Sequence, residues 1–215
     1  MFLVSTYVSS VNIGSHLNHP ERPYHHGDLK RALVETAQAM LREGEGWQFN
    51  LREVARRAGV SHTAPYKHFP DKSALLAEIA RQGYLQLRDA LTAAVGQNTP
   101  SARAELLAAS EAYLAFGRAN SSLYRLMFSA DVDKVRYEGL IEASLATFDV
   151  LLDILTRGQK EGVFRAAPLA GQAAACWALV HGLTMLDLDR QLLVEKVGPN
   201  PSEAVIESLL EGLLA

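Results

Sequence analysis

The stretch that decides the fold is residues 50–73, which read NLREVARRAGVSHTAPYKHFPDKS. Asn50 is a good helix N-cap, because its side-chain oxygen can accept hydrogen bonds from the unpaired amides of a first turn. Four apolar residues then recur at the i, i+3, i+4 and i+7 spacing of one buried helical face. They are Leu51, Val54, Ala55 and Ala58. The stretch therefore begins with a short amphipathic helix.

A turn and a second helix follow. Gly59 comes directly after the last apolar position, where a helix ends in a left-handed residue that glycine adopts at low cost. Ser61 is then placed to cap a second helix over residues 62–69, which stops before Pro70 because the residue before proline avoids the α region. Pro65 falls early in this helix, where a missing amide is expected to cost little. The whole forms a helix-turn-helix, the layout of a DNA-binding element.

The candidate DNA contacts share an outward position on this element, or a place near the start of a neighbouring helix. Such side chains can reach phosphate oxygens or base edges. They are Asn50, Ser61, His62, Thr63, Ala64, Tyr66, Lys67, His68, Lys72, Tyr24 and His26. Helix-turn-helix geometry also occurs inside helical proteins that never meet DNA. The cap, the turn, the two prolines and the polar outer face together favour DNA binding.

The same residues resemble the TetR family of bacterial transcriptional repressors. The likeness covers residues 24–87, through LREVARRAGVS at 51–61 and YKHFPDKSALL at 66–76. The second run contains an aromatic-x-x-Phe-Pro-x-Lys-x-x-Leu pattern that is specific to the family. Pro65 departs from many members, which carry an aliphatic residue there. WALVHGL at 177–183 is similar to a Trp-x-x-x-His-Gly signature in one subgroup.

The resemblance implies a three-helix DNA-binding head, a helical ligand-binding body and a homodimer. Family members usually repress an operator and release it when a small molecule binds. It accordingly implies that this chain is a ligand-responsive repressor whose partners are double-stranded DNA, a second copy and a small-molecule effector.

Composition agrees with DNA held at one end. Residues 21–90 hold 11 Lys and Arg against 9 Asp and Glu, whereas residues 91–215 hold 10 against 15. A basic head on an acidic body suits a polyanion at one end. Cys176 is the single cysteine, so we expect a reducing cytoplasm. No apolar run reaches the length of a membrane span.

The N-terminal residues are uncharged over 1–20 apart from two histidines, with no charged region typical of a signal peptide. We expect residues 1–23 to form a disordered arm, or translation to begin at a later start codon. Four histidines lie in or near this arm, but no carboxylate or cysteine accompanies them at ligand spacing. They are His16, His19, His25 and His26. We therefore expect no metal and no cofactor.

The rest of the chain predicts helices throughout. Asp28 is placed to cap a first helix over residues 29–42, and a long helix over 72–95 can link head and body. Further helices are expected over residues 101–119, 122–129, 132–161 and 169–192, with a last one after Ser202. The chain is therefore predicted to be all-α with about nine helices. The predicted DNA-binding domain spans 24–87, and the ligand-binding and dimerisation domain spans 88–215.

The helix over 169–192 is apolar on more than one side, so it should be buried most of the way round. With the last helix it could form a four-helix interface with a second subunit. The candidate interface residues are Leu179, Leu183, Leu186, Ile206, Leu209, Leu210 and Leu213. A symmetric dimer would place two recognition helices ~34 Å apart, matching a palindromic operator.

Aromatic and methionine side chains of the C-terminal half are candidates for an effector pocket. They are Tyr113, Phe116, Met127, Phe128, Phe148, Trp177, His181 and Met185. Such a lining suits a hydrophobic or aromatic effector. Ordinary core packing is the alternative for each, and a hydrogen-bonded core histidine equally explains His181.

An enzyme is the rival class. The sequence shows no glycine-rich phosphate loop, no metal-ligand cluster and no nucleophile motif. Asp187 and Asp189 are two residues apart on a helix and face different directions. A helical scaffold without DNA binding is a third alternative, which the exposed polar residues of the second helix argue against. We predict a regulator and not an enzyme, in which effector binding tilts the 72–95 helix and changes the spacing of the heads.

Overall fold

The structure, a computed structural model, describes residues 26–96 and 100–214, so the predicted arm over residues 1–23 lies outside the described residues. The helices in chain order are α1 His26–Met40, η1 Leu41–Glu45, α2 Leu51–Arg57, η2 Ala64–Lys67, α3 Lys72–Val95, α4 Ala102–Ala119, α5 Ser121–Met127, α6 Glu138–Lys160, α7 Leu169–Leu188, α8 Val194–Val197 and α9 Pro201–Leu213. Within the described ranges the only β structure is an isolated bridge between Phe164 and Leu214. The all-α prediction is confirmed.

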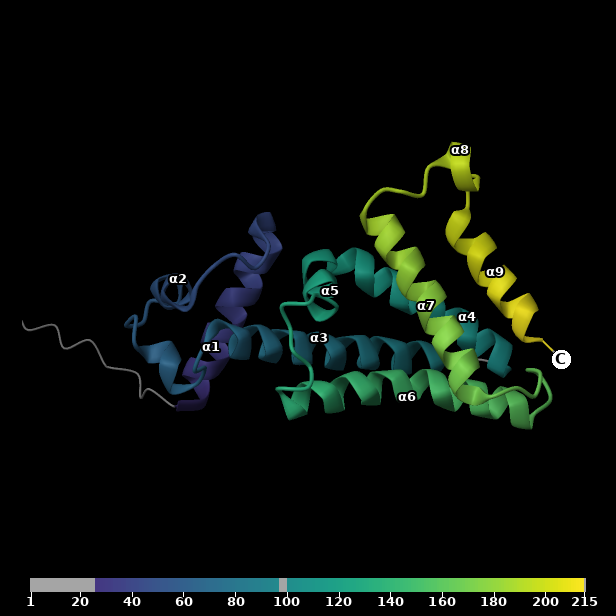
Figure 1. Cartoon of the computed structure of the whole chain (residues 1–215), viewed down its shortest axis with the longest axis horizontal. Helices are drawn as coiled ribbons and strands as arrows, with labels where there is room; N and C mark the ends of the chain where they lie inside the picture. The colour runs from purple at the N-terminus through teal and green to yellow at the C-terminus, as the bar shows by residue number, and fades with distance from the viewer. Residues whose placement is uncertain (1–25, 97–99, 215) are drawn as a thin grey trace, which may run out of the picture.

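The molecule is elongated, with a small helical head at one end and a larger helical body at the other (Figure 1). The head contains α1, α2 and η2. The long helix α3 starts in the head and runs into the body, where it packs against α6, α4 and α5. The last helices α7 and α9 pack against each other and against α4, and α9 lies at the end remote from the head.

The first helix differs from its predicted bounds at both ends. It begins at His26, so Asp28 lies inside its first turn and does not cap it, which corrects that prediction. A carboxylate is still favourable there, because the unpaired amides of a helix start carry partial positive charge. After Met40 the chain continues as a π-helical turn, and Gly44 at φ +91° ends it. Leu29, Leu33 and Ala37 form a buried stripe along this helix.

The expected helix over residues 132–161 also begins later, at Glu138. Asp133 accounts for the delay, because its Oδ1 accepts hydrogen bonds from the amides of Val135 (2.9 Å) and Arg136 (3.1 Å). A side chain that bonds nearby amides in this way competes with helix formation. Residues 131–137, hereafter the 131–137 segment, therefore form a connection of turns between α5 and α6.

Candidate nucleic-acid interface and effector cavity

The helix-turn-helix begins with a complete capping box at α2. Asn50 Oδ1 accepts hydrogen bonds from the amides of Arg52 and Glu53, both at 3.0 Å. Glu53 returns the contact, since its Oε2 accepts from the Asn50 amide at 2.7 Å. These reciprocal bonds pair three otherwise unsatisfied donors. The predicted N-cap is confirmed.

The turn after α2 is closed by Gly59, as predicted. Its φ of +72° lies in the left-handed region, and its amide bonds to Arg56 O. The amide of Val60 bonds to Ala55 O at 3.0 Å. This pair of bonds is the Schellman arrangement, which satisfies the last carbonyls of a helix and fixes the direction of the outgoing chain.

The recognition element, residues 61–69, is not the α-helix that was predicted. Its regular part is the 3₁₀-helix η2, and Ser61 does not cap it through its side chain. Pro65 explains the difference: in an α-helix capped at Ser61, the residue at position 65 must donate to Ser61 O, and proline has no amide hydrogen. Ser61 O accepts instead from Ala64 at 3.0 Å, a bond of 3₁₀ type.

The candidate DNA contacts fall into three groups. Exposed side chains of the recognition element and the turn before it are Ser61, His62, Thr63, Tyr66 and Lys67, and Asn50 is also exposed although its oxygen serves as the cap. Partly buried side chains are Ala64, His68 and Lys72. Tyr24 lies outside the described residues, and of His26 only the backbone at the start of α1 is described.

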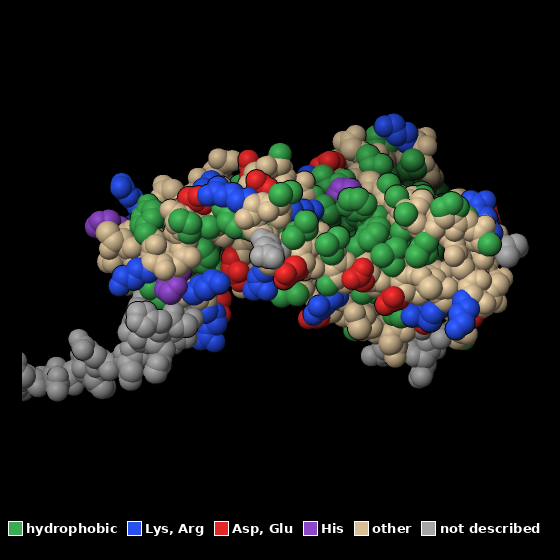
Figure 2. Space-filling view, turned by 60° about the horizontal axis from the view of Figure 1, so that its bottom comes forward, with side chains coloured by type: hydrophobic (Ala, Val, Ile, Leu, Met, Phe, Trp, Pro, Cys, Tyr) green, Lys and Arg blue, Asp and Glu red, His purple; other side chains and the backbone are tan. Residues whose placement is uncertain are grey.

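Two of the partly buried residues have specific surroundings. The Nζ of Lys72 lies 5.8 Å from the centre of the Phe49 ring, a cation–π contact that holds the side chain at the start of α3. His68 Nε2 is buried and has no hydrogen-bond partner among the residues that the structure describes. Figure 2 shows Lys, Arg and His side chains gathered around the free end of the head.

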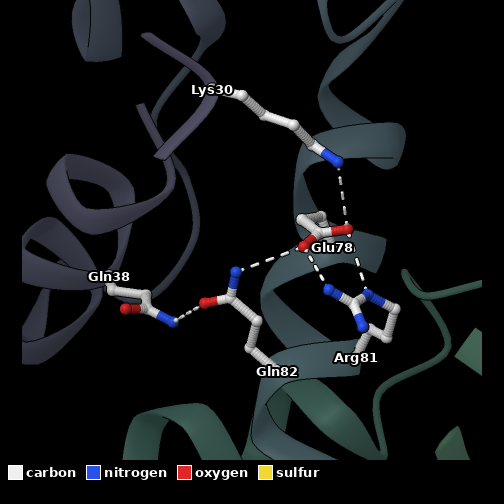
Figure 3. A network of polar contacts seen from close by, with 5 residues as sticks. All are labelled: Lys30, Gln38, Glu78, Arg81 and Gln82. Atoms are coloured by element: carbon white, nitrogen blue, oxygen red, sulfur yellow. Dashed lines mark hydrogen bonds and ion pairs between the residues drawn. The ribbon is translucent and has the colours of Figure 1, made fainter. Parts of the chain in front are cut away.

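A polar network joins α1 to α3 inside the head (Figure 3). Glu78 of α3 accepts from Arg81 Nη2 at 2.7 Å and lies 3.6 Å from Lys30 Nζ of α1. Gln82 donates to the same carboxylate at 3.2 Å and accepts from Gln38 at 3.1 Å. Burial alone would raise the pKa of Glu78, but Arg81 and Lys30 hold it below its ordinary value. The head and the start of α3 therefore share one network.

The 131–137 segment of the body contacts the head at two places. Trp47 Nε1 donates to Asp131 Oδ2 at 2.6 Å. Asp71, whose carboxylate caps α3 by accepting from Ala74, also accepts from Arg136 Nη2 at 2.8 Å. The Ala74 amide and then Arg136 hold the pKa of Asp71 below its ordinary value. The segment therefore contacts the start of the helix that connects the two halves.

A cavity of about 360 Å³ lies in the body between α3, α4, α6 and α7. Four of the eight predicted pocket residues line it: Tyr113, Phe128, Phe148 and Trp177. The other four, Phe116, Met127, His181 and Met185, do not. Lining residues that the sequence did not single out include Tyr84, Leu87, Leu91, Lys134, Leu145, Thr147 and Cys176. Burial raises the pKa of Cys176 to about 11, which keeps it a thiol.

His181 lies behind the aromatic wall of the cavity. Its Nδ1 is 2.6 Å from the hydroxyl of Tyr124, and its ring centre is 4.4 Å from that of Phe128. Burial lowers the pKa of His181, and the charge of Lys134 lowers it further. The neutral ring can therefore accept the Tyr124 proton at Nδ1 while carrying its own proton at Nε2.

The predicted dimer residues divide between the inside and the outside of the protomer. Five are buried within the chain: Leu183, Ile206, Leu209, Leu210 and Leu213. Four of the five belong to α9, whose apolar stripe packs against α4 and α7 of the same chain, and Leu183 is buried on α7. Leu186 is 47% exposed and Leu179 is partly exposed.

The helix α7 keeps much of its apolar surface outside the protomer. It is the one helix among the described residues that is long and apolar enough to span a bilayer, and 33% of its most apolar window is buried. Trp177 is 42% exposed on it, and Leu145 of α6 is 57% exposed. Figure 2 shows hydrophobic side chains gathered on one face of the body.

Comparison with known proteins agrees with this architecture. The family model described as "Bacterial regulatory proteins, tetR family" matches residues 33–79. The model described as "Tetracyclin repressor-like, C-terminal domain" matches residues 106–213. No curated protein matches the sequence.

Solved structures cover almost the whole chain. A protein of unknown function from Rhodococcus sp. RHA1 is 34% identical, with a TM-score of 0.79 over 91% of this chain and 100% of that chain. A bacterial regulatory protein in the tetR family from Rhodococcus RHA1 is 19% identical, with a TM-score of 0.66 over 87% and 98%. The TetR family transcriptional regulator PfmR from Thermus thermophilus is 22% identical, with a TM-score of 0.64 over 85% and 99%. With family models matching both its head and its body, this chain belongs to the TetR family of bacterial transcriptional regulators.

Proposed function

We propose that the protein is a homodimeric, cytoplasmic repressor that binds a palindromic operator and releases it when a small hydrophobic molecule enters the cavity. The observation that carries this proposal is the path of α3. This one helix starts at the Asp71 cap in the head and forms a wall of the cavity through Tyr84, Leu87 and Leu91. A ligand that moves α3 therefore moves the head. The proposed division into a head over residues 24–87 and a body over 88–215 falls inside this helix.

The recognition element is the part that we place in the major groove. His62, Thr63, Tyr66 and Lys67 are exposed together on a short, proline-stiffened turn, so they can approach base edges and phosphates without a large loss of backbone entropy. Lys72 and the first amides of α3 are suited to a backbone phosphate. The surface that binds DNA is then separate from the cavity.

We infer that the second subunit covers α7. Its apolar side chains Trp177 and Leu186 are exposed, whereas the apolar stripe of α9 is already buried within the protomer. Leu179 and Leu186 are the predicted interface residues that stay accessible. We also place the protein in the subgroup with the Trp-x-x-x-His-Gly signature. In this chain the signature residues are Trp177 and His181, whose ring centres lie 6.0 Å apart beside the cavity.

The 131–137 segment offers a second route from the cavity to the head. It carries Lys134 at the cavity wall, and it also carries Asp131 and Arg136, which contact Trp47 and Asp71. The bonds from Asp133 to the amides of the following residues stiffen the segment between these points. A ligand that displaces the segment would therefore favour a head orientation that does not fit the operator.

The test is fluorescence anisotropy of the full-length protein on its own upstream intergenic DNA and on scrambled DNA, across a salt series. We expect tight, sequence-selective binding by a dimer, whose mass light scattering reports. If binding to both DNAs is equal and weak, the next experiment is genome-wide selection of binding sites with the purified protein. Recovery of no enriched palindrome there would overturn the repressor proposal.

A further inference from the structure

The cavity wall is mostly apolar and carries a charge at one point. Among its described lining residues Lys134 alone carries a charge. The surrounding wall consists mainly of aliphatic and aromatic side chains such as Leu91, Phe128, Phe148 and Ile154. An apolar pocket with one charged group fixes both the chemistry and the orientation of what it binds.

Three of the five hydroxyl groups in the wall already donate to backbone carbonyl groups, and the other two belong to Tyr113 and Ser144. Ser110 donates to Leu106 O at 2.8 Å, and Tyr84 donates to Met127 O at 3.0 Å. The hydroxyl of Thr147 lies within 2.9 Å of two backbone carbonyl oxygens. Each hydroxyl has a single proton, so these residues have none left to donate to a ligand. Lys134 keeps its donors.

Lys134 is held at the cavity by aromatic rings and by no carboxylate. Its Nζ lies 4.9 Å from the centre of the Tyr84 ring and 5.2 Å from that of Phe128. No ion pair found within residues 26–96 and 100–214 includes it. The nearby Asp131 and Asp133 bond to Trp47 and to backbone amides. Burial lowers the pKa of Lys134, as expected for a cation without a counter-ion.

We propose that the effector is a small monocarboxylate with an apolar or aromatic tail, and that the Lys134 ammonium binds its carboxylate. The inference rests on the proposed function, since it assigns a chemical class to the effector of the same cavity. A volume of about 360 Å³ is near the lower end of the roughly 300–1,000 Å³ typical of ligand pockets. That size fits a free acid of medium chain length.

The position of Lys134 also explains how the carboxylate would be sensed. A new anion draws the ammonium from the rings of Tyr84 and Phe128 toward the ligand. Lys134 lies between Asp131 and Arg136 on the segment that contacts the head. The contact between Lys134 and the carboxylate would therefore both select the effector and displace the segment that contacts the head.

The test compares each acid with the alcohol of the same carbon skeleton. Octanoate and phenylbutanoate are titrated against octanol and phenylbutanol, with calorimetry and the fluorescence of Trp177, a cavity residue, as readouts. The proteins are the full-length wild type, Lys134→Met, which keeps the apolar stem, and Lys160→Met, which changes an exposed lysine at the end of α6. Operator anisotropy is recorded on the same samples.

We expect wild type and Lys160→Met to prefer at least one acid over its alcohol by about tenfold or more. Lys134→Met should lose this preference while it still binds the alcohol, which shows that the cavity is intact. Equal preference in Lys134→Met, or no binding of either acid by the wild type, would overturn the inference. If the protein binds the operator and none of the probes releases it, the proposed regulator function is retained and the monocarboxylate effector class is rejected. Acid binding without operator binding would count against the regulator alone.

Discussion

The indole nitrogen of Trp47, in the head, donates a 2.6 Å hydrogen bond to the carboxylate of Asp131, in the body. The contact joins residues 84 positions apart in the chain. Together with the Arg136–Asp71 ion pair it holds the head at a defined angle to the body. Both contacts come from the 131–137 segment, so an effector can act on this segment as well as on α3 and on the packing of α5 against η1.

Removing the contacts of the segment should uncouple effector from DNA. In the double variant Asp131→Ala, Arg136→Gln we expect the effector to bind as in the wild type. The factor by which the effector raises the operator Kd should be at least about fivefold smaller in the variant, because coupling energies are typically ~1–3 kcal/mol. The measurement is operator Kd with and without octanoate. Arg103→Gln, which breaks a surface ion pair with Glu207, is the matched control. An unchanged coupling ratio would show that the 131–137 segment does not carry the signal.

Lys72→Ala should weaken binding to every DNA sequence alike and lower the slope of log Kobs against log salt by about one unit. The reason is the loss of one phosphate contact at the start of α3, since the contact with Phe49 is worth only about 0.5–1 kcal/mol. Anisotropy across a salt series measures the slope. Lys160→Ala should leave it unchanged, and a slope in Lys72→Ala equal to that of the wild type would show that Lys72 meets no phosphate.

Gly59→Ala should destabilise the head by about 1–2 kcal/mol, because an alanine at φ +72° is held in the left-handed region. Space is not the cause, since a Cβ there meets nothing within 4 Å. Gly139→Ala in α6 is the comparison: its Cβ makes an ordinary 3.6 Å contact with Arg81, so no loss of that size is expected. Thermal unfolding of both variants checks this prediction, and equal midpoints would contradict it.

Acid should destabilise the protein through His181. Burial and then Lys134 lower its pKa in the folded state, whereas in the unfolded state it is about 6.5. Below that value the unfolded chain binds a proton that the folded chain refuses. The free energy of unfolding should then fall by up to about 1.4 kcal/mol per pH unit. Urea unfolding at about pH 7.5 and pH 5.5 should show a larger loss in wild type than in His181→Gln. Equal losses would mean that His181 is protonated in the fold.

Local hydrogen bonding made part of this structure predictable. The Asn50 cap and the Gly59 turn depend only on neighbouring backbone groups, so a short stretch of sequence determines them. The α-helix predicted across Pro65 does not form, and the reason is also local. The amide at position 65 would donate the first hydrogen bond of an α-helix capped at Ser61, and proline has no amide hydrogen. Asp133 delays the start of a predicted helix through the same kind of local hydrogen bond.

Long-range packing was harder to predict. The periodicity of α9 shows that one face is buried, but not whether its own chain or a second chain covers it, so the burial of Ile206 and Leu210 within their own chain could not be predicted. Lys134 gave no signal, because it was placed within a helix and its contacts with Tyr84 and Phe128 come from other elements.

The shortness of the recognition element limits how much sequence information one subunit can collect. Four residues of 3₁₀-helix present little more than one turn to a groove, so each subunit can inspect only a few base pairs. A bacterial chromosome offers on the order of 10⁶ competing positions or more. Finding one promoter among them then requires two half-sites read together and a preference for how the intervening duplex bends. We expect the operator to tolerate substitutions at single contacted bases better than changes in the length between its halves.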